Sequence, residues 1–194
     1  MNKTNNIKKI TLAAVMTAIS TIVYYILPEI QLVPGVDYLK IDFSDMPAIV
    51  TGIMIGPAYG ILVEVVKNII HLLRTTTFGI GELMNIGMGT AMILSIHLFS
   101  KLFSKVYKKD TMSASEYYTS SVCTIIVSIV AGWVLNSALT PIYFLIMGIE
   151  INAVTLFAGV WGSTLLNAIK SALNFLPFFP IYFAVNKAFS KIFH

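Results

Sequence analysis

Charged residues are scarce in this sequence. Only 11% of the 194 residues are Asp, Glu, Lys or Arg, whereas 57% are hydrophobic. Soluble domains carry about 25% charged residues, and a soluble fold of this length could not bury so much apolar surface in one core. The mean hydropathy of +0.82 agrees. We therefore expect an integral membrane protein, long enough for one helical bundle but too short for an added soluble catalytic domain.

Several functional motifs are also missing. The single cysteine, Cys123, excludes an intramolecular disulfide and a cysteine-based zinc or iron–sulfur site within one chain. No Walker loop is present, so the chain is not expected to hydrolyse ATP itself. The H-E-x-x-H and G-x-S-x-G motifs are absent, which leaves intramembrane proteolysis and lipid hydrolysis without an obvious catalytic set. We detect no inverted repeats, and this weakens the case for a self-sufficient secondary transporter.

Apolar runs predict an all-α membrane protein with six transmembrane helices in one domain, residues 1–194. A helix needs about 20 apolar residues to cross the hydrocarbon. The expected spans are residues 10–27, 46–55, 57–73, 81–103, 117–147 and 156–189. Gly56-Pro57 separates the second span from the third, because this pair is a strong turn signal. The second span is too short to cross alone, and a break is expected near Pro141 in the fifth.

Basic residues are distributed unevenly around these spans. Nine of the thirteen fall on the side of the two termini, at positions 3, 8, 9, 101, 105, 108, 109, 187 and 191. Only Lys40 and Arg74 fall on the other side, and Lys67 and Lys170 lie inside spans. The positive-inside rule therefore places both termini in the cytoplasm. The net charge of +4 is explained by topology, so no nucleic-acid partner is expected.

Ionisable residues inside the expected spans mark a functional site by default. Glu64, Lys67 and His71 share one helix face through their i,i+3 and i,i+4 spacing. Glu64 is placed to pair with Lys67. One interpretation is an internal ion pair that fixes packing, with His71 solvated near the outer end; another is a small intramembrane enzyme built on the three. Metal binding is not expected, because no second histidine shares this face.

Asn167 and Lys170 are also i,i+3 neighbours, and they lie near mid-membrane. Together they offer amide donors, an acceptor and a cation on one face. This set suits a neutral or mildly polar ligand with carbonyl and imide groups. Interhelical hydrogen bonding is the alternative, but it is worth only about 0.6–2 kcal/mol per contact. A lysine is a costly choice for that role, so ligand binding is favoured.

Segments along nearly the whole chain resemble the S components of energy-coupling factor (ECF) vitamin transporters, with the greatest likeness to the riboflavin-specific type. The matching segments are K-I-D-F-S-D-M-P at 40–47, G-P-A-Y-G at 56–60, V-K-N at 66–68, G-E-L-M-N at 81–85, Asn136 ahead of P-I-Y at 141–143, and N-A-I-K at 167–170. The resemblance implies a six-helix bundle in the bacterial cell membrane that binds riboflavin from outside. It implies no cofactor, and assembly with a transmembrane T component and two cytoplasmic ATPases that use ATP.

The resemblance also implies roles for individual residues. Asn136, Asn167 and Lys170 would contact the isoalloxazine ring, and Asn85 and Glu82 would join them. The loop between the first two helices would cap the ligand, with contacts from Leu39, Asp42 and Phe43. The A-x-x-x-A pattern of Ala14 and Ala18 in the first span would contact the T component, since small residues four apart allow close approach of another helix.

The chemistry of a flavin fits these residue types. Asparagine side chains match the donors and acceptors of an imide edge, and Phe43, Tyr38 or Trp161 are candidates to stack on the rings. Asn136 is followed by S-A-L-T, where larger apolar residues would be expected of a riboflavin-specific member. The alternative ligands are therefore other vitamins such as pantothenate, pyridoxine or folate.

Overall fold

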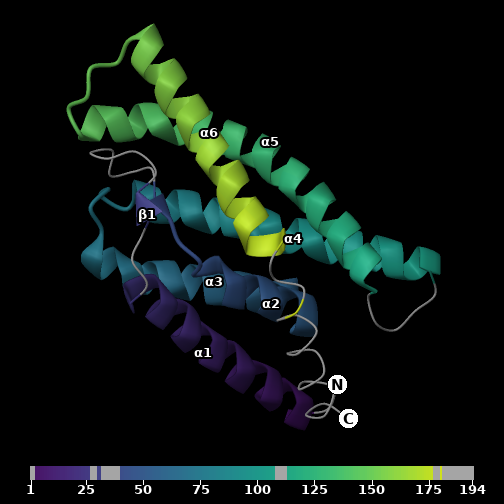
Figure 1. Ribbon diagram of the computed structural model, residues 1–194. Helices are drawn as coiled ribbons and strands as arrows, with labels where there is room; N and C mark the ends of the chain where they lie inside the picture. The colour runs from purple at the N-terminus through teal and green to yellow at the C-terminus, as the bar shows by residue number, and fades with distance from the viewer. Residues whose placement is uncertain (1–2, 27–29, 32–39, 108–112, 177–179, 181–194) are drawn as a thin grey trace.

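The computed structural model describes residues 3–26, 30–31, 40–107, 113–176 and 180. Its helices follow the order α1 (Lys3–Ile26), α2 (Asp45–Ile55), α3 (Pro57–His71), α4 (Ile80–Tyr107), α5 (Ala114–Ile146) and α6 (Ala153–Phe175), with a short 3₁₀ helix η1 (Leu72–Arg74) after α3 (Figure 1). Two short strands, β1 (Ile30–Gln31) and β2 (Lys40–Ile41), pair antiparallel with Ile30 opposite Ile41. The six-helix prediction is confirmed.

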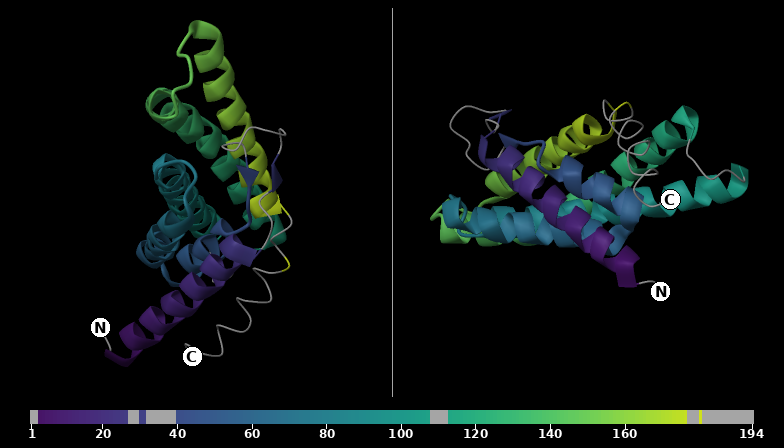
Figure 2. Two further views of the ribbon diagram at one scale, coloured as in Figure 1. Left: turned by 90° about the vertical axis from the view of Figure 1, so that its left-hand side faces the viewer. Right: turned by 90° about the horizontal axis from the view of Figure 1, so that it is seen from below.

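The helices form two groups. α1 packs on α2 and α3, α4 packs on α5, and α5 packs on α6; contacts of α4 with α2 and α3 join the groups. Two further views show α1 crossing the outer side of α2 and α3 (Figure 2). A core of buried apolar side chains, including Ile49, Val63 and Ile93, lies where α2, α3 and α4 meet. The beginnings of α1 and α5 lie toward one end of the bundle, opposite the turn between α5 and α6 (Figure 1).

Apolar side chains also cover the outside of the bundle. α1, α4 and α5 contain stretches long and apolar enough to cross a membrane, and α2 is a shorter apolar helix. Large side chains such as Ile22, Leu98 and Val130 are more than half exposed on these helices. Lipid is the medium that can cover such a surface, because an apolar patch of this extent is not stable in water.

The break between α2 and α3 lies where the sequence predicts it. α2 ends at Ile55 and α3 begins at Pro57. Gly56 between them has φ 114°, a backbone conformation that residues with a Cβ rarely adopt. Pro57 occupies the first turn of α3, where its missing N–H costs nothing. The two helices therefore fold back on one another as a hairpin.

Close packing within this hairpin depends on Gly60. A Cβ added there would lie 2.7 Å from the carbonyl oxygen of Ala48 and 2.8 Å from Cα of Gly52, both backbone atoms. We expect Gly60→Ala to lower the free energy of unfolding by about 1–3 kcal/mol, because the backbones must move apart. Thermal unfolding in detergent measures this.

Gly87 provides the matched control for that substitution. The atoms nearest to a Cβ at Gly87 all belong to the Leu135 side chain, with its two methyl groups at 2.9 and 3.3 Å. A leucine side chain can change rotamer, so Gly87→Ala should cost clearly less than Gly60→Ala. Equal losses of stability in the two variants would contradict this account of the hairpin.

The last two helices differ in part from the prediction. α5 begins with a capping box in which Ser113 and Glu116 satisfy each other's backbone N–H. It then continues through Pro141 to Ile146, so the predicted break near Pro141 is wrong. One missing backbone hydrogen bond is tolerated in a membrane helix whose neighbours compensate. α6 ends at Phe175. The predicted continuation of the sixth span past this point falls mainly outside the described residues.

Candidate functional site

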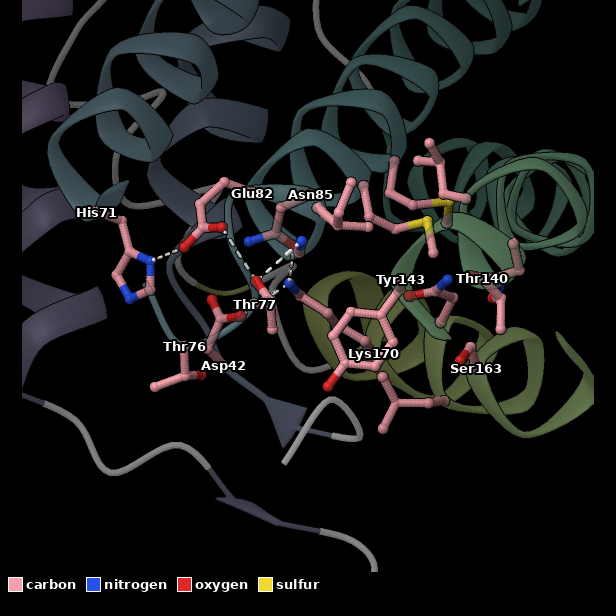
Figure 3. Close-up of a pocket in the computed structure, with 18 of the residues that line it drawn as sticks. Asp42, His71, Thr76, Thr77, Glu82, Asn85, Thr140, Tyr143, Ser163 and Lys170 are labelled. Carbon is pink, nitrogen blue, oxygen red and sulfur yellow. Dashed lines mark hydrogen bonds and ion pairs between the residues drawn. The ribbon is translucent and has the colours of Figure 1, made fainter. Parts of the chain in front are cut away.

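A cavity that is open to its surroundings lies between the two groups of helices (Figure 3). Its walls come from the ends of α1 and α3, the segment before α2, the loop after η1, the first half of α4, the second half of α5 and the middle of α6. The lining residues are Tyr24, Asp42, His71, Thr76, Thr77, Ile80, Gly81, Glu82, Met84, Asn85, Met88, Asn136, Leu139, Thr140, Tyr143, Ser163, Leu166, Asn167 and Lys170. The cavity thus has apolar walls and a polar cluster, formed by the charged and amide side chains around Lys170.

Lys170 stands at the centre of the polar cluster. Its ammonium lies 2.7 Å from Oδ1 of Asn85, 2.8 Å from Oδ2 of Asp42 and 2.9 Å from Oδ2 of Asp45. The contacts with Asn85 and Asp42 are hydrogen bonds, and the contact with Asp45 is an ion pair. These contacts connect α6 with α4, with α2 and with the segment before α2. Lys170 therefore holds together the walls of the cavity and presents a fixed positive charge to it.

The ionic contacts continue behind Lys170 into the bundle. Asp45 also pairs with Lys67, whose ammonium lies 2.8 Å from Oε1 of Glu64. The predicted Glu64–Lys67 pair is therefore confirmed, but it is part of a larger network. Glu64 and Lys67 are fully buried and Asp45 nearly so. Removing one partner of a buried pair is strongly destabilising, so each charge in the network stays next to its partners. Because Lys170 pairs with Asp45, the network fixes the position of Lys170.

Asp42 lies outside the helices, and its carboxylate closes one side of the cavity. Burial by itself would raise the pKa of Asp42. The ammonium groups of Lys170 and Lys67, with hydrogen bonds from Lys170 and Ser44, outweigh burial and hold the pKa well below its usual range. Asp42 is therefore ionised at neutral pH. It joins the segment before α2 to α6 by a charge-assisted contact.

The two asparagines of α5 and α6 lie on facing walls. Asn136 is fully buried and donates from Nδ2 to Thr164 Oγ1 at 3.2 Å. Its Oδ1 has no hydrogen-bond partner among the described residues. Asn167 packs beside Gly132, where an added Cβ would lie 3.4 Å from its amide nitrogen. Asn136 thus offers an unused acceptor, and Asn167 lines the cavity beside it.

His71 and Glu82 form a second polar group at the end of the cavity nearest α3. Nδ1 of His71 lies 2.8 Å from Oε1 of Glu82, and Thr75 and Thr77 donate to Oε2 at 2.9 and 3.2 Å. The ring of His71 stacks on Tyr24 with 3.7 Å between ring centroids. The expectation that His71 is simply solvated is wrong, because its side chain is only 12% exposed.

Six of the eight residues predicted to bind a ligand line this cavity: Asp42, Glu82, Asn85, Asn136, Asn167 and Lys170. Phe43 and Trp161 are not among the lining residues, and Trp161 is half exposed on α6. Leu39 and Tyr38 fall outside the described residues. Ligand contact by any of these side chains stays a prediction.

Two tyrosines line the cavity without having been predicted. Tyr143 lies seven residues after Asn136 on α5, and Tyr24 lies at the end of α1. The spacing of Asn136, Thr140 and Tyr143 places all three on one helix face, and this signal could have identified Tyr143. Nothing local in the sequence singles out Tyr24, because its position depends on how α1 packs against α2 and α3.

Ala14 and Ala18 are exposed on α1. Ala13 and Ser20, on the other side of the helix, are buried, and Ser20 donates a hydrogen bond to the carbonyl oxygen of Ser44. α1 therefore holds the segment before α2 with one face and leaves its small residues uncovered on another. The predicted partner contact at Ala14 and Ala18 is not tested by these observations.

Comparison with known proteins identifies relatives over most of the chain. Residues 8–182 match the family of ECF transporter, substrate-specific component. The riboflavin transporter FmnP of Bacillus subtilis is 33% identical over 125 residues, which span 62% of this chain and 64% of that protein. The riboflavin transporter RibU of Staphylococcus aureus is 27% identical over 149 residues, 77% of this chain and 74% of that protein. The Bacillus match thus covers less than two-thirds of its relative.

A solved structure supports the same assignment at the level of the fold. The S component of a bacterial ECF transporter superposes with a TM-score of 0.71 at 22% identity, covering 96% of this chain and 98% of that one. The family match spans nearly the entire sequence, and the six-helix fold agrees with it. The chain therefore belongs to the family of substrate-specific components of ECF transporters.

Proposed function

We propose that this protein is the riboflavin-binding S component of an ECF importer. The observation that supports this most strongly is the meeting of Asn136, Asn167 and Lys170 around one cavity that also has apolar walls. Relatives from two bacteria are riboflavin transporters. Ligand pockets are concave and mostly apolar, with a few polar groups that fix the orientation of the ligand, and the lining of this cavity has that character.

The polar groups match the imide end of a flavin. Oδ1 of Asn136 is a free acceptor among the described residues, and it would receive the imide N–H. The Asn167 amide and the Lys170 ammonium would donate to the neighbouring carbonyl oxygens. Tyr143 and Leu166 provide flat and apolar walls for the rings. To donate to a ligand carbonyl, Lys170 would lose its hydrogen bond with the neutral acceptor Asn85. It would keep its contacts with the carboxylates of Asp42 and Asp45.

The orientation of the bundle follows from the lysines. The start of α1 and the end of α4 carry the basic residues, and the positive-inside rule places them in the cytoplasm. The cavity is lined by the end of α1 and the start of α4. It therefore opens on the outer half of the membrane, with both termini inside. The loop between α1 and α2 would cap the ligand after it enters from outside.

Release on the inner side would depend on partner subunits. Ala14 and Ala18 on α1 would contact the transmembrane T component, and two cytoplasmic ATPases would supply the energy. The bundle would reorient in the membrane as the ATPases turn over. The protein itself would bind its ligand and release it chemically unchanged. Glu64 and Lys67, considered above as part of an enzyme, are fully buried and do not line the cavity.

Titration of the purified protein with riboflavin tests this function. Quenching of flavin fluorescence should report saturable binding in the nanomolar range, because the imide would meet fixed polar groups and the rings would meet apolar walls. Pantothenate, pyridoxine and folate in the same assay should compete poorly. Absence of riboflavin binding, with tight binding of one of the other vitamins, would assign the protein to a different ligand.

A further inference from the structure

The segment between α3 and α4, residues 72–79, has its side chains arranged in the reverse of a loop in water. It consists of η1 and the turn that follows, and it lies at the same end of the bundle as the turn between α5 and α6 (Figure 1). Connecting segments that face water are polar on the outside. Here polar side chains face the protein, and large apolar side chains face outward.

Three consecutive threonines supply the inward side of the segment. Thr75 and Thr77 donate from their hydroxyls to Oε2 of Glu82, at 2.9 and 3.2 Å. Thr76 lines the cavity. The hydroxyl of Thr75 also accepts from the backbone N–H of Gly79 at 3.3 Å, which closes the segment into a compact turn. The hydrogen-bonding groups of these threonines are therefore directed to the protein and the cavity.

The outward side of the segment is apolar. Leu73 is 88% exposed and Phe78 is 73% exposed, and Leu72 is also exposed. Ile69 on α3 is exposed as well, and it precedes the two leucines by three and four residues, so the three share one helix face. The apolar surface that lipid covers on the helices therefore continues onto residues 72–79.

The backbone of Phe78 gives an independent sign that its side chain has an outside partner. Its φ is 52°, in the left-handed region that bulky side chains rarely adopt. Strain of this kind persists where the surroundings require it. A ring so exposed gains little from packing inside the protein. Contact of the ring with lipid provides the stabilisation that packing does not.

A basic side chain lies beside these apolar residues. Arg74 is exposed, and its guanidinium lies 5.9 Å from the ring centroid of Tyr25. The hydroxyl of Tyr25 donates to the carbonyl oxygen of Ile70 at 2.9 Å, which fixes the ring against the end of α3. Tyrosine and long basic side chains are typical of the level where hydrocarbon meets the lipid headgroups. At that level Arg74 complements the charge of a lipid phosphate.

We propose that residues 72–79 form a membrane anchor, in which Leu72, Leu73 and Phe78 insert into the edge of the bilayer and Arg74 meets the phosphates of the same phospholipids. The partner is the phospholipid, and the inference does not depend on which vitamin the protein binds. The threonines of the same segment line the cavity and hold Glu82. Contact with the bilayer therefore also holds this wall of the cavity in place.

Quenching of a single tryptophan by brominated lipid measures the contact directly. Trp133 and Trp161 are replaced by phenylalanine, and Phe78→Trp introduces the reporter. The full-length protein is reconstituted into phosphatidylcholine–phosphatidylglycerol vesicles with or without bromine on the acyl chains. Bromine quenches only at close range, so the reporter should lose most of its fluorescence in the brominated vesicles. Glu150→Trp in the same background is the control, because Glu150 is exposed in the turn between α5 and α6 and should be quenched much less.

A cysteine reporter keeps the test decisive where the tryptophan variant does not fold. With Cys123 replaced by serine, Phe78→Cys in vesicles should react several-fold more slowly with a water-soluble maleimide than Glu150→Cys does. Strong quenching of Phe78→Trp or slow labelling of Phe78→Cys in folded protein supports the anchor. Quenching of Phe78→Trp no stronger than that of Glu150→Trp, with equally fast labelling of the two cysteine variants, would overturn it and place residues 72–79 in water.

Discussion

Replacing Ala14 and Ala18 together by tryptophan should reduce riboflavin uptake by cells to background while leaving riboflavin binding by the purified protein within about threefold of wild type. Both residues are exposed on α1, so the large side chains displace nothing inside the bundle. They would hold a partner helix away from a surface where small residues permit close approach. Uptake of labelled riboflavin in cells containing the partner subunits, and titration of the purified variant, measure the two effects.

The control is an equally large change on another exposed surface. Val130 is 58% exposed on α5, and Val130→Trp should leave uptake close to wild type. Loss of riboflavin binding in the Ala14→Trp, Ala18→Trp variant would show that this face packs within the bundle. Unchanged uptake would show that the partner contacts the protein elsewhere.

Replacing Lys170 by methionine should weaken riboflavin binding by about 100-fold, because a hydrogen bond from a charged group is worth about 1.5–3 kcal/mol. Methionine preserves much of the apolar length of lysine but removes the ammonium. Asp42 and Asp45 would then lose their contacts with α6. The segment before α2 should be held less firmly, which adds to the loss. Fluorescence titration gives the dissociation constant, and thermal unfolding gives the change in stability.

Lys101→Met provides the matched control for that variant. Lys101 is exposed near the end of α4, and its loss should alter neither affinity nor unfolding temperature appreciably. Asn167→Ala should weaken binding with a smaller effect on stability, because Asn167 makes no ion pair. A dissociation constant for Lys170→Met within threefold of wild type would show that the ligand lies elsewhere.

Much of this site could be predicted because polar side chains are costly inside a membrane. Lys170 and the asparagines of α5 and α6 stand out in apolar runs, and helical spacing alone shows that Asn167 and Lys170 share a face. The Glu64–Lys67 pair could also be predicted, because its two residues are three positions apart on one helix face. The Gly56-Pro57 break is also a local signal, since the backbone at Gly56 needs a residue without a Cβ.

The contacts that the sequence does not reveal are those between distant segments. Asp42 and Lys170 are 128 residues apart, and only the packing of α6 against β2, which ends just before Asp42, brings them together. Asp45 joins the Glu64–Lys67 pair because α2 packs against α3. Residue type offers Phe43, Tyr38 and Trp161 as candidates to stack on the rings, whereas packing presents Tyr24 and Tyr143 to the cavity. A stacking residue cannot be chosen from residue type without the direction of its side chain.

The central claim is that the cavity around Lys170 holds riboflavin, and the most direct measurement identifies the molecule that the protein itself retains. The protein is purified without added vitamin and analysed by mass spectrometry after denaturation. The prediction is riboflavin in near-stoichiometric amount from the wild type and little or none from Lys170→Met. Recovery of a different vitamin, or of equal riboflavin from both proteins, would contradict the account.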